Sequence, residues 1–483
     1  MNTPLRRLAS VVVLMFLALM VGATWVQFVQ APDLNSDGRN VRTLYREFGN
    51  ARGPIVVAGE SIAQSVPVDD AFGYQRVYTQ PELYAPVTGY YSVVYRRSGI
   101  EEAMTTELNG SADSLFYSRL QDLITGRQPQ GAAVELTIDP AAQQAAWDAL
   151  GDQRGAVVAL DPTTGAILAM VSKPTFDPNL LAGHVTADVT ANWAALNAAE
   201  GDVMANRAIA GNTYPPGSTF KLVTAAAALE NGLDPAAQIP APNELPLPLS
   251  SSVLRNFGGS SCSPSGEQTL ADALRISCNT AFGQLGIDLG ADVLRDQAEA
   301  FGFGTPLQVP MNVTMSYFPD EPDAAQTALS AIGQYEVRVT PLQMAMVSAA
   351  VANGGVQMKP YLVQTVRSAD LSVVTQTSPE ELGRPLSSVN ATVLRDMMVQ
   401  VVADGTGRSA QISGVQVAGK TGTAQTSADA PPHAWFTAFA PADDPRVAVA
   451  VIVENGGAMG NEATGGAVAA PIARAVIEAV LAP

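Results

Sequence analysis

The sequence predicts a membrane-anchored chain of the α/β class, in which a small β-rich domain precedes a larger domain of strands and helices. Three observations support this prediction. An apolar stretch without charge lies near the N-terminus, short β-rich runs fill residues 31–130, and strand-like segments flank a long helical middle in residues 131–483. Strands at both ends of the last region suggest one α/β domain whose sheet is completed by the two ends.

The composition excludes several classes of protein. With 47% hydrophobic and 15% charged residues, the 483-residue chain is typical of a folded protein of two or three domains. Its formal net charge is −18, whereas nucleic-acid binding needs clustered positive charge. Two histidines and two cysteines are too few and too scattered for a structural zinc site. We therefore expect no nucleic-acid partner, no metal and no cofactor.

The N-terminal segment indicates the compartment. Arg6–Arg7 precedes a stretch without charge that lasts until Asp33, which is at least the roughly 20 residues of a membrane-spanning helix. Because basic residues stay on the cytoplasmic side, we expect a cytoplasmic tail at residues 1–7, a single-pass anchor at 8–30 and an extracytoplasmic remainder. The alternative is a signal peptide cleaved after Val21–Ala23, and in either case the remaining chain is exported.

Residues 31–130 are expected to form a pedestal or docking domain. They combine β-rich runs with polar turns and contain no catalytic constellation. We interpret Tyr90, Tyr91 and Tyr95 as core and sheet residues rather than as a ligand site. Gln128–Gly131 has the composition of a linker.

The elements of residues 131–483 are predicted from local signals. Asp139 and Pro140 are expected to open a helix as its N-cap and first residue. GAVVALDPTTGAILAMVSKP predicts a hairpin around the turn Asp161–Gly165. HAWFTAFAP and RVAVAVIVEN predict two more strands, and APIARAVIEAVL predicts a closing amphipathic helix.

Lysine is scarce in this chain. Among 27 lysines and arginines, only Lys173, Lys221, Lys359 and Lys420 are lysines. An amine can become a base when it is desolvated or placed near another cation, whereas a guanidinium stays charged in a protein. Each lysine is therefore a candidate for a chemical role.

YPPGSTFK sets a hydroxyl close to one of these amines. Pro215–Gly217 breaks the preceding structure, so Ser218 is expected to begin a helix that runs to about Glu230. On that helix Ser218 and Lys221 share one face, with the amine within reach of the hydroxyl. The helix is apolar after Lys221 and therefore buried, so the amine could take the serine proton. The alternative is an N-cap serine followed by a surface lysine.

Two further motifs follow in chain order. SCN contains Ser277 and Asn279, and KTGT begins at Lys420. A serine acyltransferase needs a second hydroxyl to relay protons, an amide to hold the substrate's peptide group, and a cation with donors for a carboxylate. Ser-x-Asn alone is weak evidence, because the copy Ser388–Asn390 is expected only to cap a helix.

VQVAGKTGTAQT is expected to form a strand. Alternation places Lys420 and Gly422 on one face and Thr421 and Thr423 on the other. Gly422 would let a peptide substrate lie close to the strand, and the Thr423 N–H would form an oxyanion hole with that of Ser218. The alternative, a strand that ends in a polar turn, leaves the scarce lysine unexplained.

Cys262 and Cys278 are expected to pair, because export places them in an oxidising compartment. Closing a loop of about 15 residues would contribute about 3 kcal/mol in the chain-entropy model. The alternative is two buried free thiols.

With these motifs in order, the chain resembles the class B penicillin-binding proteins, the D,D-transpeptidases that cross-link peptidoglycan. STFK, SCN and KTGT carry the resemblance, together with GAVVALDPTTGAILAMVSKPTFDPNL, ADGTGRSAQISGVQVAGKTGTA and HAWFTAFAP. NVRTLYREFGNARGPIVVAGESIAQSVP and YAPVTGYYS extend it to the subgroup found in mycobacteria and related actinobacteria. It implies a serine β-lactamase/transpeptidase-like fold, with an antiparallel sheet flanked by helices and an all-helical subdomain, behind a dimerisation-type pedestal domain.

The resemblance implies a role for each motif. Ser218 would attack the penultimate D-alanine carbonyl of a stem pentapeptide, with Lys221 as base, and terminal D-alanine would leave. Ser277 and Lys420 would transfer a proton to the leaving amine, and Asn279 would hold the acyl-chain amide. The two lysines would each lower the other's pKa.

The KTGT hydroxyls would bind the substrate. Thr421 and Thr423 would hold its carboxylate, and an amine from a neighbouring stem peptide would then take the acyl group. β-Lactams, which mimic the donor, would acylate Ser218.

The resemblance also implies partners. Residues 31–130 are too short for the glycosyltransferase domain of class A relatives, so we expect a membrane glycosyltransferase of the shape, elongation and division type as partner. A bridge from Cys278 to Cys262 would tether the loop of SCN. The alternative functions are a D,D-carboxypeptidase, a β-lactam-hydrolysing or β-lactam-sensing protein, and a non-enzymatic scaffold of the wall-building complex.

Overall fold

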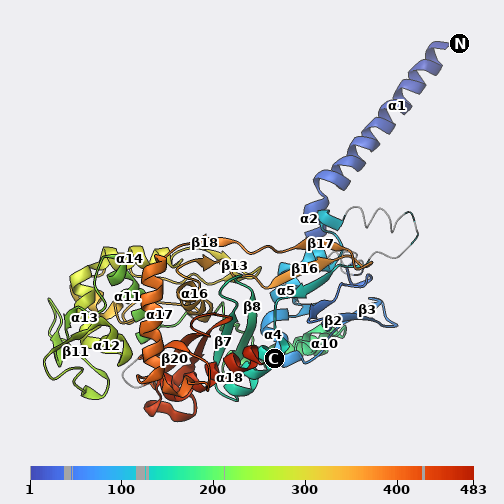
Figure 1. The fold of residues 1–483 in the computed structure, drawn as a ribbon. Helices are drawn as coiled ribbons and strands as arrows, with labels where there is room; N and C mark the ends of the chain where they lie inside the picture. The colour runs from blue at the N-terminus through green and yellow to red at the C-terminus, as the bar shows by residue number, and fades with distance from the viewer. Residues whose placement is uncertain are drawn as a thin grey trace.

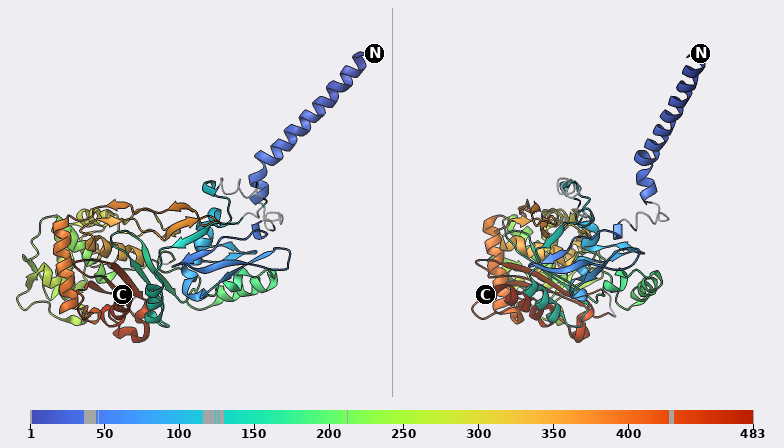
Figure 2. Two further views of the ribbon diagram at one scale, coloured as in Figure 1. Left: turned by 45° about the vertical axis from the view of Figure 1, so that its right-hand side comes forward. Right: turned by 90° about the vertical axis from the view of Figure 1, so that its right-hand side faces the viewer.

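The computed structural model describes residues 2–36, 45, 47–115, 124, 126, 130–211, 213–426 and 430–482. A long N-terminal helix projects from an elongated body, whose β-rich end lies near this helix and whose helical region lies at the far end (Figure 1). Figure 2 shows the same separation from two further directions. The order along the chain is the predicted one, with a projecting helix, a β-rich domain and an α/β domain.

The projecting helix exposes its apolar side chains. α1 (Asn2–Thr24) continues through a π-helical turn (Trp25–Val29) to the short α2 (Ala31–Ser36). Thr3–Val29 is long and apolar enough to cross a membrane, and none of it is buried in the protein. A helix satisfies its backbone hydrogen bonds internally, so this segment is suited to lipid.

The β-rich domain is built on a six-stranded sheet of order β17-β16-β6-β1-β2-β3. Its strands are β1 (Ile55–Val57), β2 (Glu60–Pro67), β3 (Tyr74–Tyr78), β6 (Ala133–Leu136), β16 (Val363–Arg367) and β17 (Val373–Gln376). β16 pairs antiparallel with β6, so a segment from the second half of the chain completes this sheet. The pedestal and the α/β domain are therefore joined by strand pairing as well as by the chain.

Short elements complete the pedestal. They are α4 (Pro81–Thr88), β4 (Tyr91–Ser92), β5 (Arg96–Arg97), α5 (Gly99–Ala103) and α6 (Thr105–Leu108). Tyr90 and Tyr91 are buried, as expected, and Tyr95 stacks on Trp193 of the α/β domain with ring centroids 4.1 Å apart. Within the predicted linker, Gln128 and Pro129 lie outside the described residues.

A buried carboxylate organises the pedestal. Glu101 is fully buried and accepts hydrogen bonds from Arg52 Nε at 2.5 Å, Arg76 Nε at 2.6 Å and the Tyr78 hydroxyl at 3.3 Å. Burial alone would raise the pKa of Glu101, but the charges of Arg76 and Arg52 outweigh it and hold the pKa below its ordinary value. The carboxylate therefore stays ionised and joins three segments of the domain.

The α/β domain contains the predicted antiparallel sheet, of order β19-β20-β21-β7-β8. Its strands are β7 (Gly155–Leu160), β8 (Ile167–Lys173), β19 (Ala418–Ala424), β20 (His433–Ala440) and β21 (Val447–Val453). β21 pairs with β7, so strands from the two ends of the domain meet at the centre of the sheet, as expected. The hairpin β7–β8 turns at Asp161–Gly165, where the Asp161 carboxylate accepts from the Thr163 N–H at 2.8 Å.

Helices cover both faces of this sheet. They are α8 (Pro140–Leu150) and α18 (Ala470–Leu481) on one face, and α11 (Lys221–Glu230) and α16 (Pro341–Ala352) on the other. Strand alternation separates the two cores, since Val157 packs with the first pair of helices and Val158 with the second. The Asp139 carboxylate caps α8 as predicted, accepting from two N–H groups at 2.8 and 3.0 Å.

The helical subdomain lies at the end farthest from the anchor (Figure 1). Its helices are α12 (Leu270–Arg275), α13 (Asn279–Leu289), α14 (Ala291–Ala300), α15 (Ala324–Ser330) and α17 (Ser388–Ala403). Ser387, rather than the predicted Ser388, caps α17, with its hydroxyl accepting from the Asn390 N–H at 3.3 Å. The prediction was wrong by one residue because two adjacent serines compete for the cap.

Short helices and two-stranded ladders connect these parts. They are α9 (Asn179–Ala182), α10 (Thr186–Ala198), β9 (Gln238–Pro240), β10 (Glu244–Pro246), β11 (Val253–Arg255), β12 (Glu267–Thr269), β13 (Leu307–Gln308), β14 (Asn312–Val313), β15 (Gln357–Met358) and β18 (Glu381–Gly383).

Replacing the buried carboxylate, Glu101→Gln, is expected to lower the free energy of unfolding by about 3–5 kcal/mol, because it leaves two buried arginines without their counter-charge. Urea denaturation of wild type and variant measures the change. The matched control is Glu102→Gln, which alters the exposed neighbour and should change stability by no more than about 0.5 kcal/mol. Equal losses in the two variants would contradict the role given to Glu101.

Candidate active site

The Ser218 loop is held against the end of β19. Ser218 is half-buried in a 3₁₀ turn, Gly217–Thr219, that immediately precedes α11. Gly217 has a φ of +53°, and a side chain there would meet the Thr423 carbonyl oxygen at 2.8 Å. Only glycine fits this close approach, so the turn that carries Ser218 lies directly beside the KTGT strand.

The predicted helix is present, with one change at its start. α11 begins at Lys221, so Ser218 occupies the preceding 3₁₀ turn rather than the α-helix itself. Residues 221–229 are all buried, and the helix ends at the predicted position, with Asn231 as C-cap. The prediction that burial would desolvate Lys221 is confirmed, since its side chain is fully buried.

The Lys221 amine contacts the SCN segment. Its Nζ lies 2.8 Å from the Ser277 carbonyl oxygen, 2.8 Å from Asn279 Oδ1 and 3.3 Å from Ser277 Oγ. Among the described residues, it makes no hydrogen bond to the Ser218 hydroxyl, although the sequence places the two groups on one helical face. The three oxygen acceptors of the SCN segment hold the amine instead.

Lys420 reaches the same hydroxyl from the sheet. Its Nζ donates to Ser277 Oγ at 2.9 Å and to the Thr421 carbonyl oxygen at 2.9 Å. Lys420 is also fully buried, in a strand whose neighbour β20 is buried throughout. The Ser277 hydroxyl therefore lies between two amines that come from a helix and a strand far apart in sequence.

Burial shifts the titration of both amines. Burial, and secondarily the charge of Lys420, lowers the pKa of Lys221 well below its ordinary value. Burial lowers the pKa of Lys420 to about 7. Neither amine forms an ion pair with the carboxylates of the described part of the chain, so no counter-charge opposes this effect. A neutral amine, able to accept a proton, is thus available near neutral pH.

The other two lysines have structural contacts. Lys173 Nζ lies 3.7 Å from the centroid of the Trp147 ring and donates to the Trp147 carbonyl. Lys359 pairs with Glu380 at 2.8 Å on the surface. Of the four lysines, Lys221 and Lys420 therefore lie at the candidate site, whereas Lys173 and Lys359 have no visible chemical role.

The SCN segment is held in a fixed conformation. Ser277 has a φ of +62°, an unfavourable backbone conformation for a residue with a side chain. The next residue, Cys278, forms a disulfide with Cys262. Asn256 Oδ1 accepts from the N–H groups of Asn279 and Thr280 at 2.9 and 3.1 Å, which satisfies the first turn of α13.

Two residues of the KTGT strand, Thr421 and Gly422, contact other parts of the protein in ways that the sequence did not predict. Thr421 is 7% exposed and its hydroxyl is hydrogen-bonded to the Thr406 hydroxyl at 2.7 Å, whereas Thr423 is half-buried. A side chain at Gly422 would meet the Pro216 carbonyl oxygen at 2.9 Å. Glycine is therefore needed at position 422 because the backbone of Pro216 lies so close. The sequence alone does not reveal this reason.

A buried ion cluster, which sequence reasoning missed, supports the Ser218 loop. Glu454, at the end of β21, accepts from the Tyr214 hydroxyl at 2.7 Å and from Arg207 Nε at 2.9 Å, and it pairs with Arg154. The Trp435 indole donates to the Pro215 carbonyl at 3.0 Å. These contacts fix the segment just before Ser218. Tyr214 adjoins the STFK motif in the sequence, which could have indicated its involvement. The sequence around Glu454 gives no indication of a role for Glu454.

No group of three or more histidine, cysteine, aspartate or glutamate side chains suited to a metal occurs within the described ranges. The chemistry assembled here is that of hydroxyls and amines: a half-buried serine, a second serine between two buried lysines, and an amide. This arrangement suits proton transfer to and from a serine nucleophile.

Comparison with known proteins defines the class. The penicillin binding protein transpeptidase domain model matches residues 155–478, and the penicillin binding protein A dimerisation domain model matches residues 52–134. The chain belongs to the penicillin-binding protein transpeptidase family, as the motifs predict.

Within this class B family, the chain is similar to mycobacterial PbpA. It is 48% identical to the peptidoglycan D,D-transpeptidase PbpA of Mycolicibacterium smegmatis, over 100% of this chain and 99% of the relative. The same protein of Mycobacterium tuberculosis is 46% identical over 100% and 99%. The ceftriaxone acyl-enzyme complex of M. tuberculosis penicillin-binding protein A superposes with a TM-score of 0.87 at 46% identity, covering 91% of this chain and 100% of that structure.

The two lysines predict the pH dependence of acylation. Acylation of Ser218 should rise with pH as the amines lose their protons, and its rising limb should lie well below the ordinary lysine pKa of about 10.4, because the pKa of Lys420 is lowered to about 7 and that of Lys221 is lowered as well. Lys420→Arg, which cannot lose its proton, should reduce the rate by about 100-fold or more. Stopped-flow measurement with a fluorescent penicillin tests both. A rising limb near pH 10 would contradict the assignment.

The disulfide predicts a redox effect at the site. Reduction of Cys262–Cys278 should slow Ser218 acylation several-fold, because the bridge tethers the segment that carries Ser277 and Asn279, and it should lower stability by about 3 kcal/mol. Cys262→Ser makes the same break without altering SCN. Acylation rates measured before and after reductant test this idea, which fails if the rates are the same.

Proposed function

We propose that this chain is a peptidoglycan D,D-transpeptidase that cross-links stem peptides through a serine acyl-enzyme during cell-wall growth and division, and that β-lactams acylate it. The observation that carries the proposal is the approach of two buried amines to the Ser277 hydroxyl, at 2.9 and 3.3 Å, one of them on Lys221, three residues after Ser218. The names of the relatives, and solved acyl-enzyme complexes with ceftriaxone and penicillin G, support it.

In acylation, the Ser218 oxygen attacks the carbonyl carbon of the penultimate D-alanine. Neutral Lys221 takes the hydroxyl proton as the new C–O bond forms. The C–N bond to the terminal D-alanine then breaks, and the leaving nitrogen receives a proton from the Ser277 hydroxyl. Lys420 or Lys221 returns a proton to Ser277, which their contacts at 2.9 and 3.3 Å support.

In the transfer step, an amine of a second stem peptide attacks the acyl carbon. Its proton goes to the same group of bases, and the C–O bond to Ser218 breaks. The hydroxyl of Ser218 is restored, and an amide cross-link is the product. The same residues therefore act in both directions of proton transfer.

Substrate binding is assigned to the remaining motif residues. Asn279 is assigned to hold the acyl-chain amide, and its Nδ2 donates to the Arg255 carbonyl at 3.1 Å. Thr423 and Thr421 are assigned to the substrate carboxylate. Because the Thr421 hydroxyl already pairs with Thr406, we include Thr406 as its orienting partner. The N–H groups of Ser218 and Thr423 are assigned to the oxyanion hole.

The membrane arrangement follows from the N-terminal helix. Residues 8–30 are assigned as the single-pass anchor, residues 1–7 as a cytoplasmic tail and the rest as extracytoplasmic, with the pedestal at 31–130 and the transpeptidase domain at 131–483. The exposed apolar helix and Arg6–Arg7 support this topology. A membrane glycosyltransferase of the shape, elongation and division type is the proposed partner that supplies glycan strands.

The decisive experiment is intact-protein mass spectrometry after treatment with a fluorescent penicillin. Wild type should gain one stable adduct, and Ser218→Ala should gain none. Ser277→Ala should acylate about 100-fold more slowly or worse, since it loses the relay. Ser388→Ala, in the second Ser-x-Asn copy, is the matched control and should behave as wild type.

A peptide assay separates the proposed reaction from its alternatives. With a donor pentapeptide and an acceptor amine, the protein should release D-alanine and form the cross-linked amide. Hydrolysis alone in the presence of acceptor would indicate a carboxypeptidase, and rapid release of the penicillin adduct would indicate a β-lactamase. Retained cell-wall function in Ser218→Ala would indicate a scaffold.

A further inference from the structure

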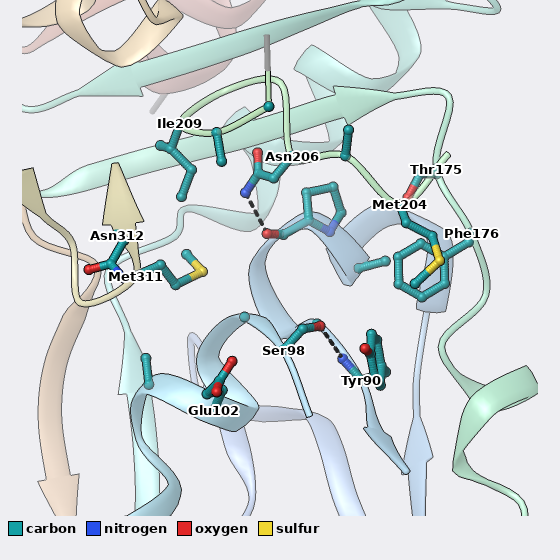
Figure 3. Close-up of a pocket in the computed structure, with 18 of the residues that line it drawn as sticks. Tyr90, Ser98, Glu102, Thr175, Phe176, Met204, Asn206, Ile209, Met311 and Asn312 are labelled. Carbon is teal, nitrogen blue, oxygen red and sulfur yellow. Dashed lines mark hydrogen bonds between the residues drawn. The ribbon is translucent and has the colours of Figure 1, made fainter. Parts of the chain in front are cut away.

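A cavity of about 800 Å³ lies between the pedestal and the α/β domain, separate from the site described above (Figure 3). One wall comes from the α4–α5 region of the pedestal. The opposite wall comes from residues 175–176, 203–206, 209–211, 308 and 310–312 of the α/β domain. None of the SCN, STFK or KTGT residues lines it. Its volume is within the range of small-ligand sites, about 300–1,000 Å³.

Part of the cavity surface is apolar and aromatic. Figure 3 shows the side chains of Tyr90, Phe176 and Met204 grouped on one side, with Ile209 and Met311 on the other. The rings of Tyr90 and Phe176 meet edge to face, with centroids 6.3 Å apart, and both residues are largely buried. A ligand here would bury apolar surface against rigid walls.

The charge of the cavity is negative. Glu102 is the sole charged residue among the described residues that line it, and it forms no ion pair within the described part of the chain. Glu102 and Tyr90 both line the cavity, and burial, followed by the charge of Glu102, raises the pKa of the Tyr90 phenol. The exported chain also has a strong negative net charge, which favours cations in its surroundings.

At least one oxygen atom among the polar groups that line the cavity has no hydrogen-bond partner in the described residues. The Asn206 amide is occupied, since it donates to the Pro86 carbonyl at 2.7 Å and accepts from the Ala208 N–H at 3.1 Å. By contrast, the Thr175 hydroxyl oxygen is buried and has no hydrogen-bond partner among the described residues. A buried hydroxyl without a partner is unfavourable, and a donor group on a ligand would satisfy it.

We propose that this cavity binds a primary ammonium group carried on a short apolar chain. The ammonium would donate to the Glu102 carboxylate in a charge-assisted hydrogen bond. The apolar chain would pack on Phe176 and Met311, and the ligand would contact both domains at once. The ammonium can come from a free alkylamine or from a lysine side chain of a partner peptide.

The test measures binding to the full-length protein in detergent by isothermal titration. The probes are n-hexylamine, the dipeptide acetyl-Phe-Lys-amide and its uncharged isostere acetyl-Phe-norleucine-amide. At least one amine should bind, with the isostere about tenfold weaker than the lysine peptide or worse, as expected for loss of a charged hydrogen bond. Tighter binding of hexylamine than of the lysine peptide would point to a free amine, and the reverse order to a partner chain.

Two variants and one control make the test specific. Glu102→Gln should weaken amine binding about tenfold or more. Ala103→Arg, which adds a cation at the same wall, should abolish it. Glu82→Gln removes another exposed carboxylate of the pedestal that does not line the cavity, and it should bind the amines as wild type does. Failure of both amines to bind, equal affinity for the isostere, or unchanged binding in Glu102→Gln would overturn the proposal.

Discussion

The candidate active site depends on one constraint. Two lysine amines are buried against a single serine hydroxyl, and no carboxylate of the described residues pairs with them. Lys221 and Lys420 approach Ser277 Oγ at 3.3 and 2.9 Å, and both side chains are fully buried. A charged amine is unstable in such surroundings, and a second charge beside it makes the first still less stable. The site therefore holds a proton acceptor at a pH where an exposed lysine would be fully protonated.

The rest of the fold keeps these amines buried and aligned. The apolar helix α11 carries Lys221, and the β19 edge of a fully packed sheet carries Lys420. The SCN segment is fastened by the Cys262–Cys278 bridge and by Asn256, and the turn before Ser218 is fastened by Glu454. Catalysis by such a group requires positions fixed in advance, because a displaced base loses most of its effect.

Local chemistry explains which features could be predicted from the sequence. The Asp139 cap, the hairpin at Asp161–Gly165 and the KTGT strand follow from short-range rules, and all three are present. The partners of the motifs could not be predicted in the same way. Asn256, Thr406 and Glu454 meet the site only through tertiary packing, and their immediate neighbours in sequence give no signal. The pairing of β16 with β6 likewise depends on contacts between distant segments.

The most direct measurement of the central claim is the protonation state of the lysines themselves. The chain has only four, so ¹³C labelling of lysine ε-carbons gives four NMR signals that single Lys→Arg variants assign. Exposed Lys359 is the reference. The signal of Lys420 should titrate near pH 7, and that of Lys221 well below the ordinary lysine value. Titration of both near the ordinary value of about 10.4 would contradict it.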